Sequence, residues 1–198
     1  MSSEAKPIII LASTSTYRQE LLRRICPEFE VKEPIVEETP LDQESAVACA
    51  KRLSIAKAGS VAELQTVGRI VIGSDQVADC EGRWLSKPGT TSNAIDQLQY
   101  ASGRTAVFYT GLCVWNTNTH RYDSEVINTE VKFRDLELSA IERYVAKEDV
   151  LGCAGSAKSE GLGITLLDSI LGDDPTALVG LPLIALSRIL RRHGITLP

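Results

Sequence analysis

The sequence predicts an α/β fold, and three observations support this class. An apolar run at residues 7–12 leads through a hydroxyl-rich turn into a helical pattern, which is the order strand, turn, helix. Residues 70–72 form an uninterrupted β-branched run, typical of a strand that is buried on both faces. Strand patterns at 106–115 and 122–133 flank turn-forming residues and predict a long antiparallel pair.

The composition is that of an ordinary globular protein. The chain has 198 residues, which fits one medium domain or two small lobes with a substantial core. Its net charge of -5 argues against a general affinity for nucleic acid or for an anionic membrane. This balance is still compatible with a local basic pocket for a small phosphorylated ligand.

The five cysteines lie far apart and never form a C-x-x-C pair, so neither a zinc cluster nor a disulfide framework is indicated. They predict reduced thiols in a cytosolic protein. The apolar run at 8–12 is too short for a signal peptide or a membrane span. We therefore expect a cytoplasmic protein.

The first strand, at 7–12, is followed by a turn that begins with Ser13, and a helix is expected from 17 to 25. Hydroxyls and backbone N–H groups at a helix N-terminus suit an anion, and Arg18 adds a guanidinium for phosphate oxygens. The alternative is plain N-capping, with Arg18 on the surface. The chain contains neither G-x-x-x-x-G-K-[ST] nor a strand-following G-x-G-x-x-G, so these nucleotide-binding signatures do not apply.

A second strand is expected at 29–32, and Glu37 and Glu38 follow it in a loop bounded by prolines. Adjacent acids in such a loop are usually solvated, and they become interesting only if the fold brings them to Asp75. A helical pattern then runs from 42 to 64 and includes Lys57, whose ordinary interpretation is a solvated helix residue.

Asp75 is the candidate for a catalytic acid or base, because G-S-D-Q at 73–76 follows the buried run at 70–72. Ligands of open α/β sheets bind outside the carboxyl ends of strands, and this position is predicted to be such an end. The alternative is a capping or turn aspartate. A tight hairpin at 81–82 is expected to direct Lys87 back toward the strand ends.

The remaining pattern alternates helices, loops and short strands. The expected order is a helix capped by Thr91 or Ser92 that runs to 100, a helix at 138–147 opened by Ser139, a glycine-rich loop at 152–163, a strand at 164–167, a turn-rich stretch at 168–178 and a final helix to 192. The glycine-rich stretch is either a ligand-facing loop or a plain connector.

Seven short motifs follow one another in the order of a known family. They are L-A-S-T-S-T-Y-R-Q-E-L-L at 11–22, E-E-T-P at 37–40, R-L-S-I-A-K-A at 52–58, G-S-D-Q-V at 73–77, K-P at 87–88, S-G-R…Y-T-G at 102–111 and L-V-G-L-P-L at 178–183. Together they resemble the Maf family of nucleotide pyrophosphatases. The block at 154–166 further resembles the subfamily that hydrolyses 7-methyl-GTP, because members acting on dTTP and UTP carry Gln where this chain has Glu160.

The resemblance implies an α/β fold with a mixed twisted sheet, flanking helices and two lobes around a cleft, similar to the inosine-triphosphate pyrophosphatase-like (Maf/Ham1) fold. It implies a single domain over residues 1–198 and a homodimer as the usual assembly. The implied reaction converts 7-methyl-GTP to 7-methyl-GMP and pyrophosphate with a divalent metal cation, Mg²⁺ or Mn²⁺. The alternatives are a Maf pyrophosphatase for dTTP, UTP or other modified nucleotides, and a nucleotide-binding regulator linked to cell division.

The resemblance also assigns roles to residues by their place in the motifs. The proton acceptor is Asp75, the metal-binding positions are Glu38 and Asp75, the phosphate-binding positions are Ser13, Arg18, Lys57 and Lys87, and the positions associated with base selection are Tyr17, Gln76 and Glu160. Two departures occur in the first motif. Thr16 replaces the usual Pro, and Tyr17 stands where the methyl-GTP subfamily often has Trp, although Tyr keeps an aromatic face for stacking.

Overall fold

The computed structural model describes residues 7–197, which divide into two compact units. Unit 1 comprises residues 7–75, 110–127 and 174–197, and unit 2 comprises residues 76–109 and 128–173. The chain passes from unit 1 into unit 2 between Asp75 and Gln76. The predicted single domain with two lobes around a cleft stays a prediction.

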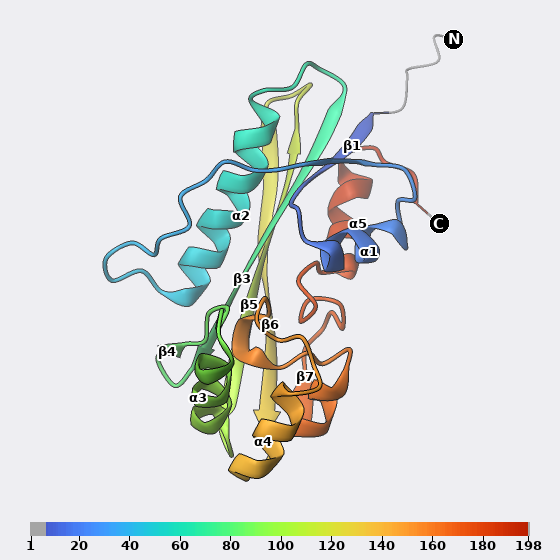
Figure 1. Cartoon of the computed structure of the whole chain (residues 1–198). Coiled ribbons are helices and arrows are strands. Elements are labelled where there is room, and N and C mark those ends of the chain that lie inside the picture. Colours follow the sequence, from blue (N-terminus) through green and yellow to red (C-terminus); the bar gives the residue numbers. More distant parts are fainter. Residues whose placement is uncertain (1–6, 198) are drawn as a thin grey trace. The chain divides into compact units, whose positions relative to one another are not determined.

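Strands and helices are interspersed along the described chain (Figure 1). The strands are β1 (Ile8–Ala12), β2 (Glu30–Lys32), β3 (Arg69–Cys80), β4 (Arg83–Trp84), β5 (Thr105–Asn116), β6 (Arg121–Phe133) and β7 (Leu167–Leu171). The helices are α1 (Thr16–Arg23), α2 (Ala46–Ala62), α3 (Thr91–Ala101), α4 (Leu138–Val145) and α5 (Leu183–Arg192), with 3₁₀ helices η1 (Ala154–Ser156) and η2 (Leu162–Leu166).

The sheet contains both parallel and antiparallel neighbours. Its strand order is β2-β1-β3-β5-β6-β7, with β4 paired to β3 outside this path. β1 pairs in parallel with β2 and β3, whereas β4 and β7 pair antiparallel to β3 and β6. The predicted mixed α/β sheet with flanking helices is therefore confirmed.

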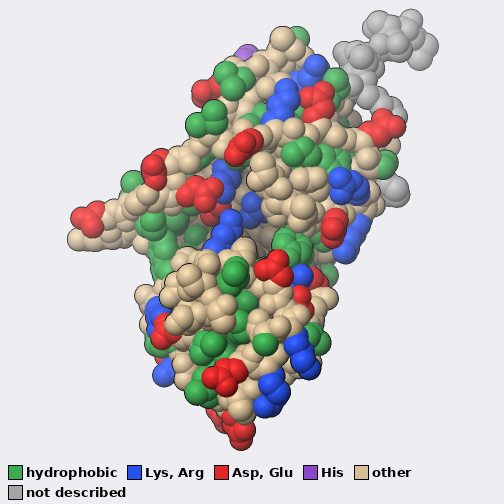
Figure 2. Space-filling model, in the orientation of Figure 1, with side chains coloured by type: hydrophobic (Ala, Val, Ile, Leu, Met, Phe, Trp, Pro, Cys, Tyr) green, Lys and Arg blue, Asp and Glu red, His purple; other side chains and the backbone are tan. Residues whose placement is uncertain are grey.

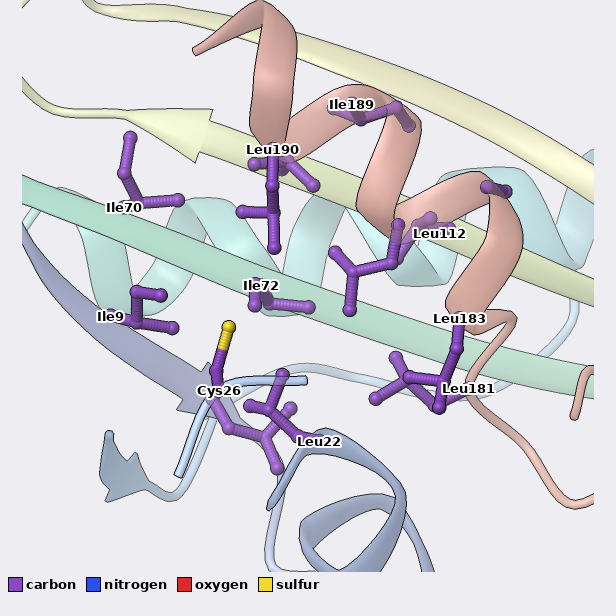
Figure 3. Packing of buried hydrophobic residues seen from close by; sticks show 14 of the residues in the cluster. Ile9, Leu22, Cys26, Ile70, Ile72, Leu112, Leu181, Leu183, Ile189 and Leu190 are labelled. Carbon is purple, nitrogen blue, oxygen red and sulfur yellow. The ribbon is translucent and has the colours of Figure 1, made fainter. Parts of the chain in front are cut away.

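In unit 1 the sheet is buried on both faces. Successive side chains of a strand point to opposite sides, so neighbouring residues of one strand enter different clusters. Ile9 and Leu11 of β1 face a cluster that includes leucines and isoleucines of α1 and α5 (Figure 3). Ile10 and Ala12 face the other way, into a cluster with Val61 and other residues of α2. Full burial of a Leu or Ile side chain contributes about 1.5–3 kcal/mol, so this two-sided packing fixes the first strands firmly.

Two glycines allow α2 to lie directly on the strands of unit 1. A Cβ atom on Gly73 would lie 2.3 Å from the carbonyl oxygen of Ser54, and one on Gly111 would lie 2.1 Å from that of Ala50. Contacts this short do not occur, so β3 and β5 can approach the helix backbone only where a side chain is missing. The close approach brings the middle of α2, including Lys57, next to β3.

Helix α5 begins with a cap supplied from earlier in the chain. Its N-cap residue is Pro182, which offers no side-chain acceptor. The buried carboxylate of Asp174 instead accepts from the backbone N–H groups of Ile184 and Ala185, at 2.7 and 3.2 Å. The hydroxyl of Thr176 accepts from the N–H of Leu183 at 2.7 Å. These bonds satisfy N–H groups that have no partner inside the helix and fix the segment that precedes α5.

In unit 2 the predicted hairpin is confirmed. Glu81 and Gly82 adopt φ values of 52° and 87°, which turn the chain so that β4 pairs with the end of β3. Helix α3 packs against α4 and against η1. The glycine-rich stretch contains η1 and the start of η2 and is otherwise irregular.

The expectation that the strand ends before Asp75 is wrong, because β3 continues to Cys80. The pairing of β3 with β1 stops at Ile72, after which β3 continues along its other neighbours, β4 and β5. Asp75 therefore lies inside a long strand, just beyond the carboxyl end of β1. The topological argument still applies to that end, although not to the end of β3 itself.

Three smaller expectations also differ from the structure. Thr90 caps α3 and Glu137 precedes α4, so the predicted caps are wrong by one or two residues. Residues 162–166 form the 3₁₀ helix η2 rather than a strand, with the Thr165 hydroxyl donating to the carbonyl of Leu162. The last strand starts at Leu167, where the pairing with β6 begins.

The face drawn in Figure 2 carries acidic and basic side chains close to one another, so neither sign of charge forms a continuous field there. Within residues 7–197, none of the helices is both long and apolar enough to cross a membrane.

Candidate active site

Three charged residues of unit 1 converge on one point. The ammonium nitrogen of Lys57 lies 2.6 Å from Oδ1 of Asp75 and 2.6 Å from Oε1 of Glu38. Lys57 comes from α2, Asp75 from β3 and Glu38 from the loop between β2 and α2. Two carboxylates that accept from the same ammonium must lie close together, so the acidic loop does reach Asp75.

The inner part of this cluster is shielded from water. The side chains of Lys57 and Asp75 are 8% and 10% exposed, whereas that of Glu38 is 58% exposed. A buried charge is tolerated when it is paired and hydrogen-bonded, and Lys57 achieves this with both carboxylates. Removing one partner of a buried pair typically costs about 3–5 kcal/mol, because the other charge is left uncompensated.

The loop between β1 and α1 builds a second part of unit 1. The Ser15 hydroxyl caps α1 by accepting from the N–H of Arg18 at 3.4 Å, which is the structural role foreseen for this turn. The buried Ser13 hydroxyl accepts from the Ser15 N–H at 3.2 Å and from the Arg18 guanidinium at 3.4 Å. Arg18 therefore turns toward Ser13 and does not extend into solvent.

The charge of Arg18 is coupled to the carboxylate cluster. Burial lowers the pKa of its guanidinium from the ordinary value, while the negative charges of Asp75 and Glu38 act in the opposite direction. Arginine stays protonated in proteins, so Arg18 supplies a fixed positive charge near these carboxylates. A guanidinium is well suited to phosphate oxygens because its N–H groups form a planar fork.

Ser74 and Gly180 are two site-forming residues that the sequence did not single out for function. The carbonyl oxygen of Gly180 accepts from Nε of Arg18 at 2.9 Å. The buried Ser74 hydroxyl lies 2.9 Å from the same oxygen and 2.8 Å from the carbonyl oxygen of Gly111, and it donates to both in a shared bond. The family motif around residue 180 was the only sequence signal for Gly180. Its role as an acceptor belongs to a backbone carbonyl, which every residue type has.

In unit 2, Lys87 lies exposed in a short loop after β4. Side chains of α3 fix the flanking backbone, since Gln97 donates to the carbonyl of Ser86 and Asn93 donates to that of Pro88, each at 2.9 Å. Gln97 also accepts from the Ser156 hydroxyl at 2.7 Å. One buried amide thus ties the Lys87 loop to the glycine-rich stretch, a connection that no sequence pattern indicated.

The rest of the glycine-rich stretch is held by side chains of α4 and its C-terminal end. The Tyr144 hydroxyl accepts from the N–H of Lys158 at 2.9 Å, and Glu148 accepts from the N–H of Leu162 at the same distance. Burial raises the pKa of Tyr144 to about 12. Glu160 lies between these anchors with an exposed side chain, 3.4 Å from the Ser159 hydroxyl. The stretch is therefore an anchored loop, and its ligand-facing role stays a prediction.

The predicted site residues are divided between the two units. Unit 1 holds Asp75, Glu38, Lys57, Ser13, Arg18 and Tyr17, and unit 2 holds Gln76, Lys87 and Glu160. Within unit 1 the structure brings the carboxylates to Lys57 and brings Ser13 to Arg18. Tyr17 is half-buried in the first turn of α1, and Gln76 is half-buried on β3. The roles of all these residues stay predictions.

The carboxylates fit a hard divalent cation. Among residues 7–197 no group of three or more His, Cys, Asp or Glu side chains is arranged to hold a metal ion. Mg²⁺ in nucleotide sites commonly takes only one or two carboxylates, with substrate phosphates and waters as its other ligands. Asp75 and Glu38 provide this donor set, and their oxygens also suit Mn²⁺.

Comparison with known proteins identifies the family. The family model described as "Maf-like protein" matches residues 8–193. The chain belongs to the Maf family. A 7-methyl-GTP pyrophosphatase of Aromatoleum aromaticum is 54% identical over 96% of this Maf protein and 97% of its own length. One of Cupriavidus metallidurans, with the same name, is 47% identical over 98% and 97% of the two chains.

Two solved structures are more distant from this Maf protein. The Ham1 protein of Staphylococcus aureus has a TM-score of 0.46 and 17% identity, covering 64% of this chain and 72% of its own. A nucleoside-triphosphatase, or dITP/XTP pyrophosphatase, of Mycobacterium abscessus has a TM-score of 0.45 and 16% identity, covering 93% and 96%.

Proposed function

We propose that this Maf protein hydrolyses 7-methyl-GTP to 7-methyl-GMP and pyrophosphate. The observation that carries the proposal is the convergence of Asp75 and Glu38 on Lys57, in the unit that also holds Arg18 and Ser13. This is a set of oxygen donors and fixed cations suited to a metal-bound triphosphate. The names of the relatives at 47–54% identity, over almost their whole length, support the same substrate.

In the proposed reaction, water attacks the α-phosphorus of the nucleotide. A P–O bond forms to the water oxygen, the bond from the α-phosphorus to the bridging oxygen breaks, and pyrophosphate leaves with that oxygen. Asp75 accepts the water proton on Oδ2, while Oδ1 keeps its bond to Lys57. Lys57 thereby fixes the orientation of the base during the step.

The remaining residues bind and neutralise the substrate. Arg18, Lys57 and Lys87 bind phosphate oxygens and stabilise the charge that develops as the bond breaks. Ser13 orients Arg18 through their hydrogen bond. Asp75 and Glu38 would hold Mg²⁺ or Mn²⁺, which when bound offsets the charge of the triphosphate and acts as a Lewis acid on the phosphoryl oxygens.

Base selection is proposed to rest on Glu160, Tyr17 and Gln76. Guanine presents N1–H and N2–H donors, so a carboxylate at Glu160 is a better partner than an amide, which brings its own N–H₂ group. Methylation of N7 makes the ring cationic and strengthens its stacking on an aromatic face such as Tyr17, by about 0.5–2 kcal/mol. Gln76 follows the base Asp75 directly and is proposed to contact the nucleotide as well.

The proposal also covers the cell compartment and the assembly of the enzyme. We place it in the cytoplasm, since its five cysteines lie far apart in the sequence and form no disulfide among the described residues, and we propose a homodimer as its assembly. Gel filtration coupled to light scattering measures the assembly. A monomer at micromolar concentration would overturn the dimer without affecting the proposed reaction.

The test is pyrophosphate release from 7-methyl-GTP, GTP, dTTP, UTP and ATP with Mg²⁺ or Mn²⁺. We expect 7-methyl-GTP to be the best substrate and Asp75→Asn to lower turnover about 10²–10⁴-fold, because a positioned base is lost. Asp173→Asn is the matched control, since this carboxylate is exposed. Preference for a pyrimidine nucleotide would overturn only the proposed selection of 7-methylguanine. Absence of product from all five nucleotides would overturn the proposed hydrolase activity.

A further inference from the structure

We propose that Arg52 is a positioning residue that holds the loop carrying Glu38 against α2. The inference rests on the proposed function, in which Glu38 binds the metal. Arg52 lies on α2, about 1.4 turns before Lys57, and it contacts the loop between β2 and α2 at two places.

The first contact is a bidentate ion pair. Nε of Arg52 lies 2.6 Å from Oε1 of Glu44, and a terminal guanidinium nitrogen lies 2.7 Å from Oε2. The Glu44 side chain is 7% exposed and that of Arg52 is 29% exposed, so the pair is largely removed from solvent. Such fork-to-fork pairs fix geometry as well as charge, which distinguishes this pair from an ordinary surface ion pair.

The second contact reaches the residue next to Glu38. The same guanidinium nitrogen donates to the carbonyl oxygen of Thr39 at 3.2 Å. Consecutive Cα atoms are only about 3.8 Å apart, so a bond to Thr39 restricts where the Glu38 side chain can start. Arg52 sets the backbone of the loop, and Lys57 on the same helix then meets the Glu38 carboxylate.

Two apolar side chains of the loop, those of Ile35 and Leu41, do not pack into a core. Residues 33–45 lie outside helices and strands, and the apolar side chains of Ile35 and Leu41 are 85% and 58% exposed, so they do not anchor it in a core. Glu44 also accepts from the N–H of Leu41 at 3.1 Å, which ties the middle of the loop to the Arg52 pair. Arg52 with its contacts to Glu44 and Thr39, which we call the clamp, therefore fixes residues 39–44 as one piece.

Charge keeps the clamp closed over a wide pH range. The hydrogen bonds from Arg52 hold the pKa of Glu44 down to about 2, and the carboxylate in turn raises the pKa of Arg52. Both partners are thus charged at any pH at which a nucleotide hydrolase is assayed.

The test compares wild type with Arg52→Ala in the absence of nucleotide. We expect amide hydrogen exchange at residues 37–44 to become faster, and the dissociation constant for Mn²⁺, measured from the electron paramagnetic resonance signal of the unbound ion, to rise about tenfold, as for other residues that orient metal ligands. Arg188→Ala is the matched control. It breaks another Arg–Glu pair of unit 1, in which one guanidinium nitrogen of Arg188 lies 2.7 and 2.6 Å from the two carboxylate oxygens of Glu125.

A double-mutant cycle with Glu38→Gln separates positioning from general loss of stability. If Arg52 acts through Glu38, Arg52→Ala weakens Mn²⁺ binding in wild type and leaves it unchanged in the Glu38→Gln background. Equal weakening in both backgrounds, or unchanged exchange at 37–44, would overturn the proposal. Because neither measurement needs turnover, these results stand apart from the substrate panel, whose failure would overturn the proposed function instead.

Discussion

At Lys57 a single ammonium binds two carboxylates, which makes three charges depend on one another. Asp75 and Glu38 both accept from it at 2.6 Å, and Lys57 and Asp75 are almost fully buried. Groups fixed in this way need no rearrangement when charge develops on a substrate, which is the condition for strong electrostatic stabilisation. The proposed phosphoryl chemistry would use this fixed arrangement.

Glu160→Gln is expected to reduce the preference for 7-methyl-GTP over UTP. The carboxylate can accept two hydrogen bonds from guanine, whereas the amide offers one acceptor oxygen and a donor group that faces the donors of the base. A hydrogen bond to a charged group contributes about 1.5–3 kcal/mol, so the ratio of kcat/KM values should fall about tenfold or more. Competitive assays with both nucleotides measure this ratio.

The control for this prediction is Asp168→Asn, which removes an exposed carboxylate from the same unit. It should leave the ratio unchanged. The same substrate ratio in Glu160→Gln as in wild type would show that this side chain does not select the base.

The sequence indicated candidate site residues through motifs. Only the contacts in the structure could distinguish a buried, paired side chain from a solvated one. Lys57 fits the pattern of a solvated helix residue, because helical periodicity carries no information on a buried partner 18 positions away. The burial of Arg18 against Ser13 and Gly180 was equally invisible, since its main acceptor is a backbone carbonyl. Motifs indicate candidate residues, and the structure adds the long-range pairs that these residues form.

At the scale of elements, the close packing of α2 on β3 determines whether Lys57 can reach Asp75. We expect Gly73→Ala to destabilise the fold by about 1–3 kcal/mol, the usual cost of overpacking. The new Cβ would lie 2.3 Å from the carbonyl oxygen of Ser54 and 2.6 Å from the backbone nitrogen of Ala58, next to Lys57. The value of kcat should fall by more than the loss of folded protein explains, because the displaced helix weakens the contact between Lys57 and Asp75. Urea unfolding and kcat measure the two effects.

Gly152→Ala is the matched control for this change. No atom lies within 4 Å of a Cβ built at Gly152, so the substitution should leave the stability close to that of wild type. Equal stability of Gly73→Ala and Gly152→Ala would mean that α2 adjusts without cost, and the packing argument would then be wrong.

The elements themselves were predicted well where periodicity is strong and poorly where tertiary contacts decide. The cores of β1, α2 and α5 follow from their apolar patterns. The length of β3 does not, because its pairing continues with neighbours that are remote in sequence. The cap of α5 comes from Asp174, eight residues before its N-cap Pro182, which is beyond the reach of any local capping rule.

For the whole molecule, the sequence did not predict how the two units divide the chain. Each of β3, β5 and β6 contributes one segment to each unit, so three of the four boundaries fall inside strands, and only the one between Asp173 and Asp174 lies in a loop. Compositional signs of a domain boundary are therefore missing. The match to the Maf family covers residues 8–193 and thus includes segments of both units.

Buried weak acids connect the stability of the whole protein to alkaline pH. Burial raises the pKa of Cys113 to about 12, and burial with the hydrogen bond of Glu44 raises that of Cys49 to about 11, from an ordinary value of 9.0. Burial also raises the pKa of Tyr144, from an ordinary value of 10.0 to about 12. Above pH 9 the unfolded chain releases protons that the folded chain retains, so the free energy of unfolding falls as pH rises from 9 toward 12.

We expect the free energy of unfolding to be insensitive to these groups below pH 9 and to decrease above it by up to about 1.4 kcal/mol per pH unit for each group. Cys113→Ala should make this decrease shallower, because one proton-retaining group is removed. Val114→Ala, at the neighbouring buried position, should lower stability at every pH and leave the slope as in wild type. Urea unfolding at a series of pH values measures both quantities.

If Cys113→Ala and wild type lose stability with the same slope above pH 9, then the Cys113 thiol ionises as readily in the folded protein as in the unfolded chain. The core of unit 1 is then more open to water than its packing indicates.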